Sequence, residues 1–308
     1  MSSSLIALSR VSRRFGDARA VDDLSLSVDR GELFGIIGPD GAGKTTTIRM
    51  VCGLLRPDAG EIRVLGLDPV RDHRRLTESV GYLSQRFSLY GDLSVDENIR
   101  FFADIHGVYD SASRADRLLA LTQLTPFRRR LAQQLSGGMK QKLALACTLV
   151  HQPDLILLDE PTTGVDPVSR REFWKLLSEF LASGVTIVMS TPYLDEAERC
   201  SRVALIHEGR LLALDRPSVL RAGLPGTIVE ILAADRARTL EALQDLPDVL
   251  GVESFGERVH VRMADAPEPA VRQVGAGLAR AGIDTSGVRP VSASLEDVFV
   301  TMLGGARE

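Results

Sequence analysis

Residues 38–46 read Gly-Pro-Asp-Gly-Ala-Gly-Lys-Thr-Thr. They fit the phosphate-loop pattern G-x-x-x-x-G-K-[ST], in which backbone N–H groups grip a triphosphate. Glycines suit this task because they let the backbone approach the phosphates closely. Lys44 is expected to reach the outer phosphates, and the Thr45 hydroxyl is expected to ligate Mg²⁺. The predicted nucleotide-binding residues of this phosphate loop are Gly38, Pro39, Asp40, Gly41, Ala42, Gly43, Lys44, Thr45 and Thr46.

The segments on either side of the loop support this interpretation. Residues 32–37 form a short apolar run suited to a buried parallel strand, and residues 46–55 place apolar side chains at helical spacing. The loop would then lie at the N-terminus of a helix, where the helix dipole favours anions. The pattern predicts an α/β fold with a triphosphate site between a strand and a helix.

Two acids follow a second apolar run. Residues 155–158 read as a buried strand, and Asp159 and Glu160 come directly after it, at the end where ligands bind in parallel α/β sheets. Asp159 suits the shell of Mg²⁺, and Glu160 suits a general base that activates water for γ-phosphate hydrolysis. Gln85 follows another short strand and could hold Mg²⁺ or orient that water, although a lone glutamine is usually a solvated loop residue.

A second anion-binding helix start is predicted near the middle of the chain. Ser136 precedes Gly137 and Gly138, and helical residues 140–149 follow. A single chain rarely needs two such sites for one nucleotide. Near the N-terminus, Phe15 stands just before the predicted turn of a hairpin, where it could stack on an adenine ring or pack in the core.

Together these motifs resemble the nucleotide-binding subunit of an ATP-binding cassette (ABC) transporter. The resemblance covers residues 5–220 and includes the run Leu-Leu-Asp-Glu-Pro-Thr-Thr-Gly-Val-Asp-Pro at 157–167. It implies a P-loop NTPase with a RecA-like core and a helical subdomain at about residues 86–150. It also implies a head-to-tail dimer that encloses two ATP molecules.

The resemblance assigns further residues to the nucleotide site. Ser136, Gly137 and Gly138 would face ATP bound to the partner subunit, and Asp166 would communicate between the two sites. Phe15 would match the adenine-stacking aromatic.

Two positions depart from the family pattern. Met139 stands where many members have glutamine, a change expected to be tolerated because Ser136 and the backbone make the contact. Pro192 stands where the family usually has a histidine that touches the γ-phosphate. Proline has neither a side-chain donor nor an N–H, so we expect hydrolysis to be slowed or to rely more heavily on Glu160. Alternatively, Tyr193 or water substitutes and nothing functional changes.

The composition shifts beyond residue 220. Residues 221–226 read as a linker, and the order of elements after it is β-α-β-β-α-β, the split arrangement of a ferredoxin-like fold. We therefore expect an ATP-binding domain at 1–222 and a small α+β accessory domain at 227–308. His260 stands alone on a predicted strand and favours a structural or exposed role over a ligand. Residues 294–300 resemble the closing segment of subunits from drug and polysaccharide exporters.

The composition limits which classes of partner the protein is expected to bind. The formal net charge of -4 argues against binding nucleic acid through overall basicity. No apolar stretch approaches the ~20 residues of a membrane span, and three widely spaced cysteines read as buried thiols in a reducing compartment. These features predict a cytoplasmic protein. The family resemblance implies that it is held at the inner face of the cell membrane through a separately encoded permease.

Two functions remain open from the sequence. In the first, the chain is the ATPase subunit of an exporter, with drugs or other hydrophobic compounds as the leading substrate class. In the second, it is a soluble ABC-type ATPase that acts on ribosomes or DNA. The first is favoured because soluble translation factors of this superfamily usually carry two such domains in one chain, and DNA-repair members contain a long coiled coil.

Overall fold

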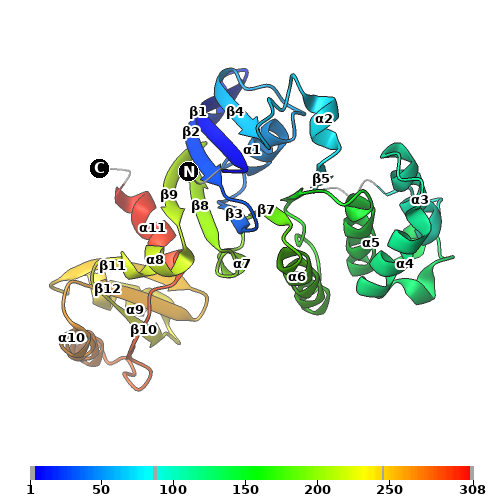
Figure 1. Ribbon diagram of the computed structural model, residues 1–308. Helices are drawn as coiled ribbons and strands as arrows, with labels where there is room; N and C mark the ends of the chain where they lie inside the picture. Colours follow the sequence, from blue (N-terminus) through cyan, green and yellow to red (C-terminus); the bar gives the residue numbers. More distant parts are fainter. Residues whose placement is uncertain (1–3, 86–88, 245, 306–308) are drawn as a thin grey trace. The chain divides into compact units, whose positions relative to one another are not determined.

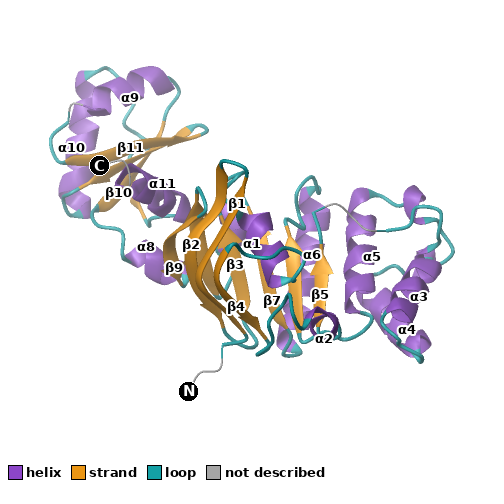
Figure 2. Cartoon of the chain, turned by 90° about the horizontal axis from the view of Figure 1, so that it is seen from above, coloured by secondary structure: helices purple, strands orange, loops and turns teal. Residues whose placement is uncertain are grey.

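The computed structural model describes residues 4–85, 89–244 and 246–305. The first residues of the predicted helical subdomain (86–88) and the outermost residues of both predicted domains (1–3 and 306–308) lie outside this range. The chain divides into two compact units, residues 1–214 and 215–308. Figures 1 and 2 show the elements of each unit.

A six-stranded sheet forms the centre of the first unit, in the order β5-β6-β7-β3-β8-β9. Its first five strands are parallel. Strands β3, β6 and β7 are buried at every residue, as expected for a parallel sheet covered on both faces. The strands are β3 (Leu33–Ile37), β5 (Val80–Leu83), β6 (Leu155–Asp159), β7 (Thr186–Thr191), β8 (Arg202–His207) and β9 (Arg210–Asp215).

Helices connect these strands. The helix after the phosphate loop is α1 (Lys44–Val51), and α2 (His73–Thr77) precedes β5. Strand β6 leads into α6 (Pro167–Ala182), and β7 leads into the short α7 (Leu194–Ala197). The order of strand, loop and helix predicted around residues 38–46 is confirmed.

A separate antiparallel sheet has the order β2-β1-β4. Strands β1 (Ile6–Phe15) and β2 (Ala18–Val28) form the predicted hairpin, and β4 (Ala59–Val64) pairs with the other edge of β1. Apolar side chains from this sheet and from α1 share one hydrophobic core with β3 and β6. The core anchors both ends of the phosphate loop.

The helical region comprises α3 (Val95–Ile105), α4 (Ser111–Leu121) and α5 (Gly137–Leu149), with 3-10 turns at Thr125–Phe127 and Ala132–Gln134. Ser94 and Glu97 cap α3 reciprocally, which the sequence Ser-x-x-Glu predicts. Arg128 binds Asp96 of α3 at 2.9 Å and Asp116 of α4 at 2.6 Å, so it links these two helices.

The second unit contains a four-stranded antiparallel sheet in the order β11-β12-β10-β13. The strands are β10 (Thr227–Leu232), β11 (Val249–Phe255), β12 (Arg258–Met263) and β13 (Arg289–Val291). With α9 (Arg236–Gln244) after β10 and α10 (Pro267–Arg280) after β12, they give the predicted β-α-β-β-α-β order. In the predicted ferredoxin-like arrangement, the first strand lies between the third and the fourth, as it does here.

Two further helices complete this unit. Helix α8 (Pro217–Ala222) packs against the last helix, α11 (Leu295–Gly305). This contact explains why the unit begins at residue 215, ahead of the segment that the sequence suggests as a linker. Along β12, Val259, Val261 and Met263 are buried with α9 and α10, so the alternate residues point to the opposite face of the sheet.

Candidate active site

The phosphate loop connects β3 to α1, and its glycines are required by its surroundings. Gly43 caps α1 with a φ of 99°, and a Cβ there would lie 2.3 Å from the carbonyl oxygen of Ala20. A Cβ at Gly38 would lie 2.2 Å from the carbonyl oxygen of Ile206. Larger side chains would therefore push the loop away from the neighbouring strands.

Lys44 lies inside the loop that it follows. Its Nζ donates to the carbonyl oxygens of Gly38 at 2.9 Å and Pro39 at 3.0 Å, and forms an ion pair with Glu160 at 3.0 Å. Only 3% of the lysine side chain is exposed. The cation is thus held inside the phosphate loop, next to Glu160.

Asp159, at the end of β6, lies next to Thr45. The hydroxyls of Thr45 and Ser190 both donate to Asp159 Oδ1, at 2.9 and 2.7 Å. The other carboxylate oxygen, Oδ2, is buried and has no hydrogen-bond partner among the residues that the structure describes. A buried carboxylate oxygen beside a threonine hydroxyl fits a hard cation, and Mg²⁺ is commonly bound by one carboxylate together with substrate phosphates. These residues fit the predicted Mg²⁺ site.

Glu160, the residue after β6, also lies in the site. Its backbone has a φ of 48°, which is uncommon for a residue with a side chain and is often found at functional sites. One oxygen, Oε1, pairs with Lys44, and Oε2 accepts from Gln85 Nε2 at 2.9 Å. The structure therefore brings Lys44, Thr45, Gln85, Asp159 and Glu160 together from three distant segments.

Ser190 was not assigned a role from the sequence, yet it organises both acids. Its hydroxyl donates to Asp159 while accepting the backbone N–H of Glu160 at 3.0 Å. The only signal in the sequence is its position near the end of a buried apolar run. Pro192 follows directly after β7, and Gly38 N donates to Thr191 O at 3.4 Å. The turn containing Pro192 therefore lies beside the first residue of the phosphate loop.

The second predicted anion site lies elsewhere in this unit. In Figures 1 and 2, α5 stands apart from α1, with β5 between them. Ser136 caps α5 by accepting from Met139 N at 3.3 Å, a contact that does not depend on the side chain of residue 139. Ser136 and Gly137 are exposed, whereas a Cβ on Gly138 would lie 2.2 Å from Ser169 Oγ.

Asp166 caps α6 and lies close to the start of α5, since a Cβ on Gly138 would lie 3.9 Å from Asp166 Oδ2. Its Oδ1 accepts from the N–H groups of Val168 and Ser169, both at 3.0 Å. Hydrogen bonds from Ser169 hold the pKa of Asp166 below its usual value. The predicted site residues thus form two groups, one around Lys44 and one around Ser136 and Asp166.

Phe15, at the end of β1, belongs to neither group. Its side chain is 50% exposed, so the alternative that it packs in the core is wrong. The Arg13 guanidinium lies 5.0 Å from the ring centroid, and Arg13 is in turn held by Asp58 at 2.5 Å. The ring is accessible for stacking.

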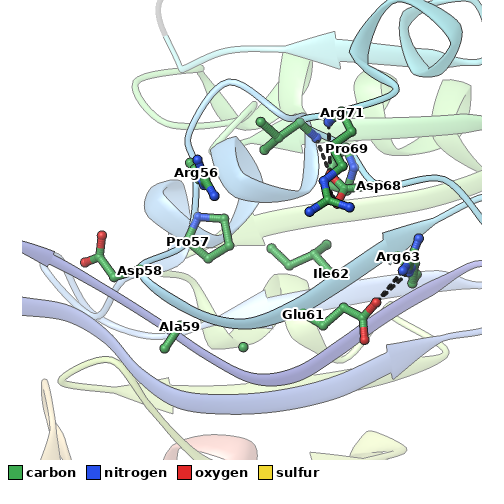
Figure 3. A pocket seen from close by; sticks show the side chains of 12 residues that line it. Arg56, Pro57, Asp58, Ala59, Glu61, Ile62, Arg63, Asp68, Pro69 and Arg71 are labelled. Atoms are coloured by element: carbon green, nitrogen blue, oxygen red, sulfur yellow. Dashed lines mark hydrogen bonds and ion pairs between the residues drawn. The ribbon is translucent and has the colours of Figure 1, made fainter.

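Figure 3 shows a different hollow, of about 430 Å³, lined by residues 56–63 and 68–71. Two of its three arginines face acids, since Arg63 pairs with Glu61 and Arg71 lies 3.7 Å from Asp68. Because these charges offset one another, the hollow offers no concentrated positive charge for a triphosphate. The nucleotide site is better placed at Lys44.

Comparison with known proteins agrees with this geometry. Residues 21–163 match the family model described as ABC transporter. Over 314 residues the chain is 34% identical to a daunorubicin resistance ATP-binding protein of Streptomyces coeruleorubidus, covering 100% of this chain and 98% of that protein. The chain belongs to the ABC transporter ATP-binding proteins.

Other members of the ABC family resemble the chain to a similar degree. It is 39% identical to the Nod factor export ATP-binding protein I of Burkholderia pseudomallei, over 99% of this chain and 98% of that protein. It is 40% identical to the probable multidrug ABC transporter ATP-binding protein YbhF of Escherichia coli. That match covers 99% of this chain and 53% of the relative, so the chain spans about half of the E. coli protein.

Solved structures of ABC proteins also match. An ATP-binding subunit of an ABC transporter aligns with a TM-score of 0.65 and 30% identity, over 71% of this chain and 92% of that chain. A dimeric ATP-binding cassette in a post-hydrolysis state, bound to ADP and Pi, aligns with a TM-score of 0.61 and 26% identity. It covers 68% of this chain and 98% of that chain. The predicted P-loop NTPase fold is confirmed.

Among the described residues, no helix has the length and apolar character needed to cross a membrane. The same residues contain no group of three or more His, Cys, Asp or Glu side chains arranged to hold a metal. The three cysteines are free and buried, as predicted.

Proposed function

We propose that this ABC protein binds and hydrolyses ATP as the energy-supplying subunit of an exporter whose permease is a separate chain. The observation that carries the proposal is the convergence of Lys44 and Thr45 from the phosphate loop with Asp159 and Glu160 from β6. A charged lysine, a hydroxyl, an unpartnered carboxylate oxygen and a second acid are the groups that phosphoryl transfer to water requires.

Each residue has a proposed part in hydrolysis. Backbone N–H groups of the phosphate loop after Pro39 hold the phosphates, and Lys44 exchanges Glu160 for an outer phosphate oxygen. Glu160, once released from Lys44, accepts the proton of the attacking water, and Gln85 orients that water beside it. Thr45 and Asp159 would hold Mg²⁺, which neutralises charge on the phosphate oxygens when bound. Phe15 stacks on the adenine.

A second copy or a related subunit completes the site. Ser136 and Gly137 are exposed at the N-terminus of α5, where the helix dipole favours an anion. They lie with Asp166 and apart from the phosphate loop of their own chain. We propose that they bind the ATP held by the partner subunit, so that two nucleotides lie between two chains and Asp166 connects the two sites.

The names of the relatives support a proposal for the transported compound. Proteins that match this chain over nearly their whole length are named for daunorubicin resistance and for Nod factor export. We propose efflux of drugs or other hydrophobic compounds, driven from the cytoplasmic face of the membrane through the permease. The unit at residues 215–308 would steady or regulate the dimer.

Co-expression with a candidate permease tests the export role. A gene beside the one for this chain that encodes a protein with about six spans of ~20 apolar residues is the first candidate. We expect the two proteins to co-purify from detergent-solubilised membranes, and the permease to raise ATP turnover. Recovery of the chain with ribosomes, and none with the permease, would instead support a soluble ATPase.

A further inference from the structure

Glu196 is a buried acid that the proposed hydrolysis does not use. It lies on the short helix α7, and its side chain is 1% exposed. Oε2 accepts from the Thr191 hydroxyl at 2.7 Å. Oε1 lies 3.5 Å from Trp174 Nε1 and 3.6 Å from Arg170 Nε. Burial of a carboxylate is unfavourable unless such partners compensate for the lost water. We therefore looked for a role for Glu196 in the contacts of its partners.

The partners of Glu196 fix the turn that follows β7. While Thr191 Oγ1 donates to Glu196, it accepts the N–H of Tyr193 at 3.1 Å. The intervening residue, Pro192, has no N–H to contribute. Above the same turn, the Arg170 guanidinium lies 4.6 Å from the centroid of the Tyr193 ring. Residues 191–193 are therefore held by the Thr191 hydroxyl, which bonds both Glu196 and Tyr193, and by the Arg170 guanidinium, which stacks on the Tyr193 ring.

The contacts of Glu196 also extend, through Arg170, to the turn at Asp166. Arg170 and Trp174 both lie on α6, one and two turns after its start, and Arg170 N donates to Asp166 O at 2.9 Å. At the opposite end, Thr191 O accepts from Gly38 N of the phosphate loop. A continuous set of buried and half-buried contacts thus connects the phosphate loop to the start of α6.

We propose that Glu196 and Arg170 are positioning residues that couple the turn at residues 191–193 to the turn at Asp166. A shift of the first turn on nucleotide binding would move α6 and so alter the surface offered to the second nucleotide. This inference rests on the proposed function, because it presumes that ATP binds at Lys44. It assigns to these two residues no contact with ATP.

Hydrogen exchange with mass spectrometry distinguishes ATP binding at Lys44 from coupling through Glu196 and Arg170. Peptides from residues 38–46 report ATP binding, and peptides from residues 166–172 report coupling. We expect ATP to change the protection of both in the wild type. In Glu196→Gln, which keeps the size of the side chain but removes its charge, we expect the first response to persist and the second to be lost. Arg170→Met should behave in the same way.

Glu32→Gln provides a matched control. Glu32 has an 11% exposed side chain and pairs with Arg202 at 3.2 Å, but it precedes β3, at the opposite end of that strand from the phosphate loop. We expect this variant to respond to ATP as the wild type does, in both peptides. The control separates loss of coupling from the general cost of removing a buried charge.

Turnover provides a second readout. We expect Glu196→Gln to lower kcat about tenfold or more, as loss of precise positioning does, with KM for ATP within about twofold of the wild type. The double variant Arg170→Met/Glu196→Gln should lose no more than either single variant, because the two residues act as one unit.

Three results would overturn the inference: an intact response at residues 166–172 in Glu196→Gln, no response there in the wild type, or losses of kcat that multiply in the double variant. If ATP leaves residues 38–46 unprotected in the wild type, the proposed function fails, and the inference fails with it.

Discussion

Lys44 and Glu160 form an ion pair in which Nζ lies 3.0 Å from Oε1, and the two side chains are only 3% and 8% exposed. The lysine also donates to the carbonyl oxygens of Gly38 and Pro39, so all three of its N–H donors are engaged. A phosphate can bind Lys44 only by replacing one of these partners. Glu160 is the partner whose release also frees a base, so binding and activation of the site are linked.

Replacement of Lys44 by methionine should destabilise the protein, because Glu160 would remain buried without its cation. We expect the free energy of unfolding to fall by roughly 3 kcal/mol, measured by urea denaturation. Adding Glu160→Gln should recover most of this loss without restoring ATP binding. Equal stability of the single and double variants would show that the ion pair contributes nothing.

Asp159→Asn should weaken Mg²⁺ binding specifically. The amide can still accept from Thr45 and Ser190, but the charge on the unpartnered oxygen Oδ2 is lost. We expect the Mg²⁺ concentration for half-maximal ATP turnover to rise at least about tenfold, while metal-free ATP binding in EDTA is retained. Unchanged Mg²⁺ dependence would exclude Asp159 as a ligand.

Pro192→His should raise ATP turnover in the assembled complex, because an imidazole adds a donor beside the phosphate loop. The gain is expected to be on the order of tenfold, below the ~100-fold effect of a fully positioned donor. Pro192→Ala is the control, since it restores only the backbone N–H. A histidine variant that is no faster than wild type would indicate that Tyr193 or water already fills this role.

The sequence predicted the local features of the site but not most of the contacts between residues that are distant in the chain. The phosphate loop, the Ser136 cap and the strand before Asp159 depend on residues that are neighbours in the chain, so their patterns are readable. The pairing of Lys44 with Glu160 and the bridging role of Ser190 depend on the order of strands in the sheet. Gln85 was considered either as a Mg²⁺ ligand or as a residue that orients water, and both roles stay predictions; its amide N–H contacts Glu160, a contact that the sequence does not indicate.

A contact in the second unit was also not predicted from the sequence. His260 was expected to be structural or exposed, and it proves to be half-buried and structural. Its Nδ1 lies 2.8 Å from Asp297 Oδ1, and its Nε2 lies 3.5 Å from Glu230. Asp297 is 37 residues away on α11, where it also accepts from Ser294. No pattern within β12 indicates this partner, because only the packing of α11 against the sheet brings it close.

This histidine should make α11 sensitive to pH. The hydrogen bond to Asp297 raises the pKa of His260. Burial by itself would raise the pKa of Asp297, but hydrogen bonds from His260 and Ser294 lower it overall. The histidine's contribution to stability is complete below its unfolded pKa of ~6.5 and is lost as the pH rises through its raised pKa. The aspartate's contribution is complete above ~3.9 and is lost as the pH falls through its lowered pKa.

The pair should therefore stabilise α11 most between about pH 4 and 6.5. We expect hydrogen-exchange protection factors of residues 295–305, corrected for intrinsic rates, to fall between pH 6 and pH 8.5. In His260→Gln, this pH-dependent loss should disappear. A variant that retains the wild-type pH dependence would contradict the assignment.

The most direct test of ATP hydrolysis at Lys44 and Glu160 is the ATPase rate of the purified chain beside that of Glu160→Gln. Both proteins should also be passed over a size-exclusion column in ATP and Mg²⁺. We predict that the wild type hydrolyses ATP, and that the variant loses at least about 100-fold in kcat while eluting as an ATP-held dimer. A variant that hydrolyses ATP as fast as the wild type would contradict the central role of Glu160.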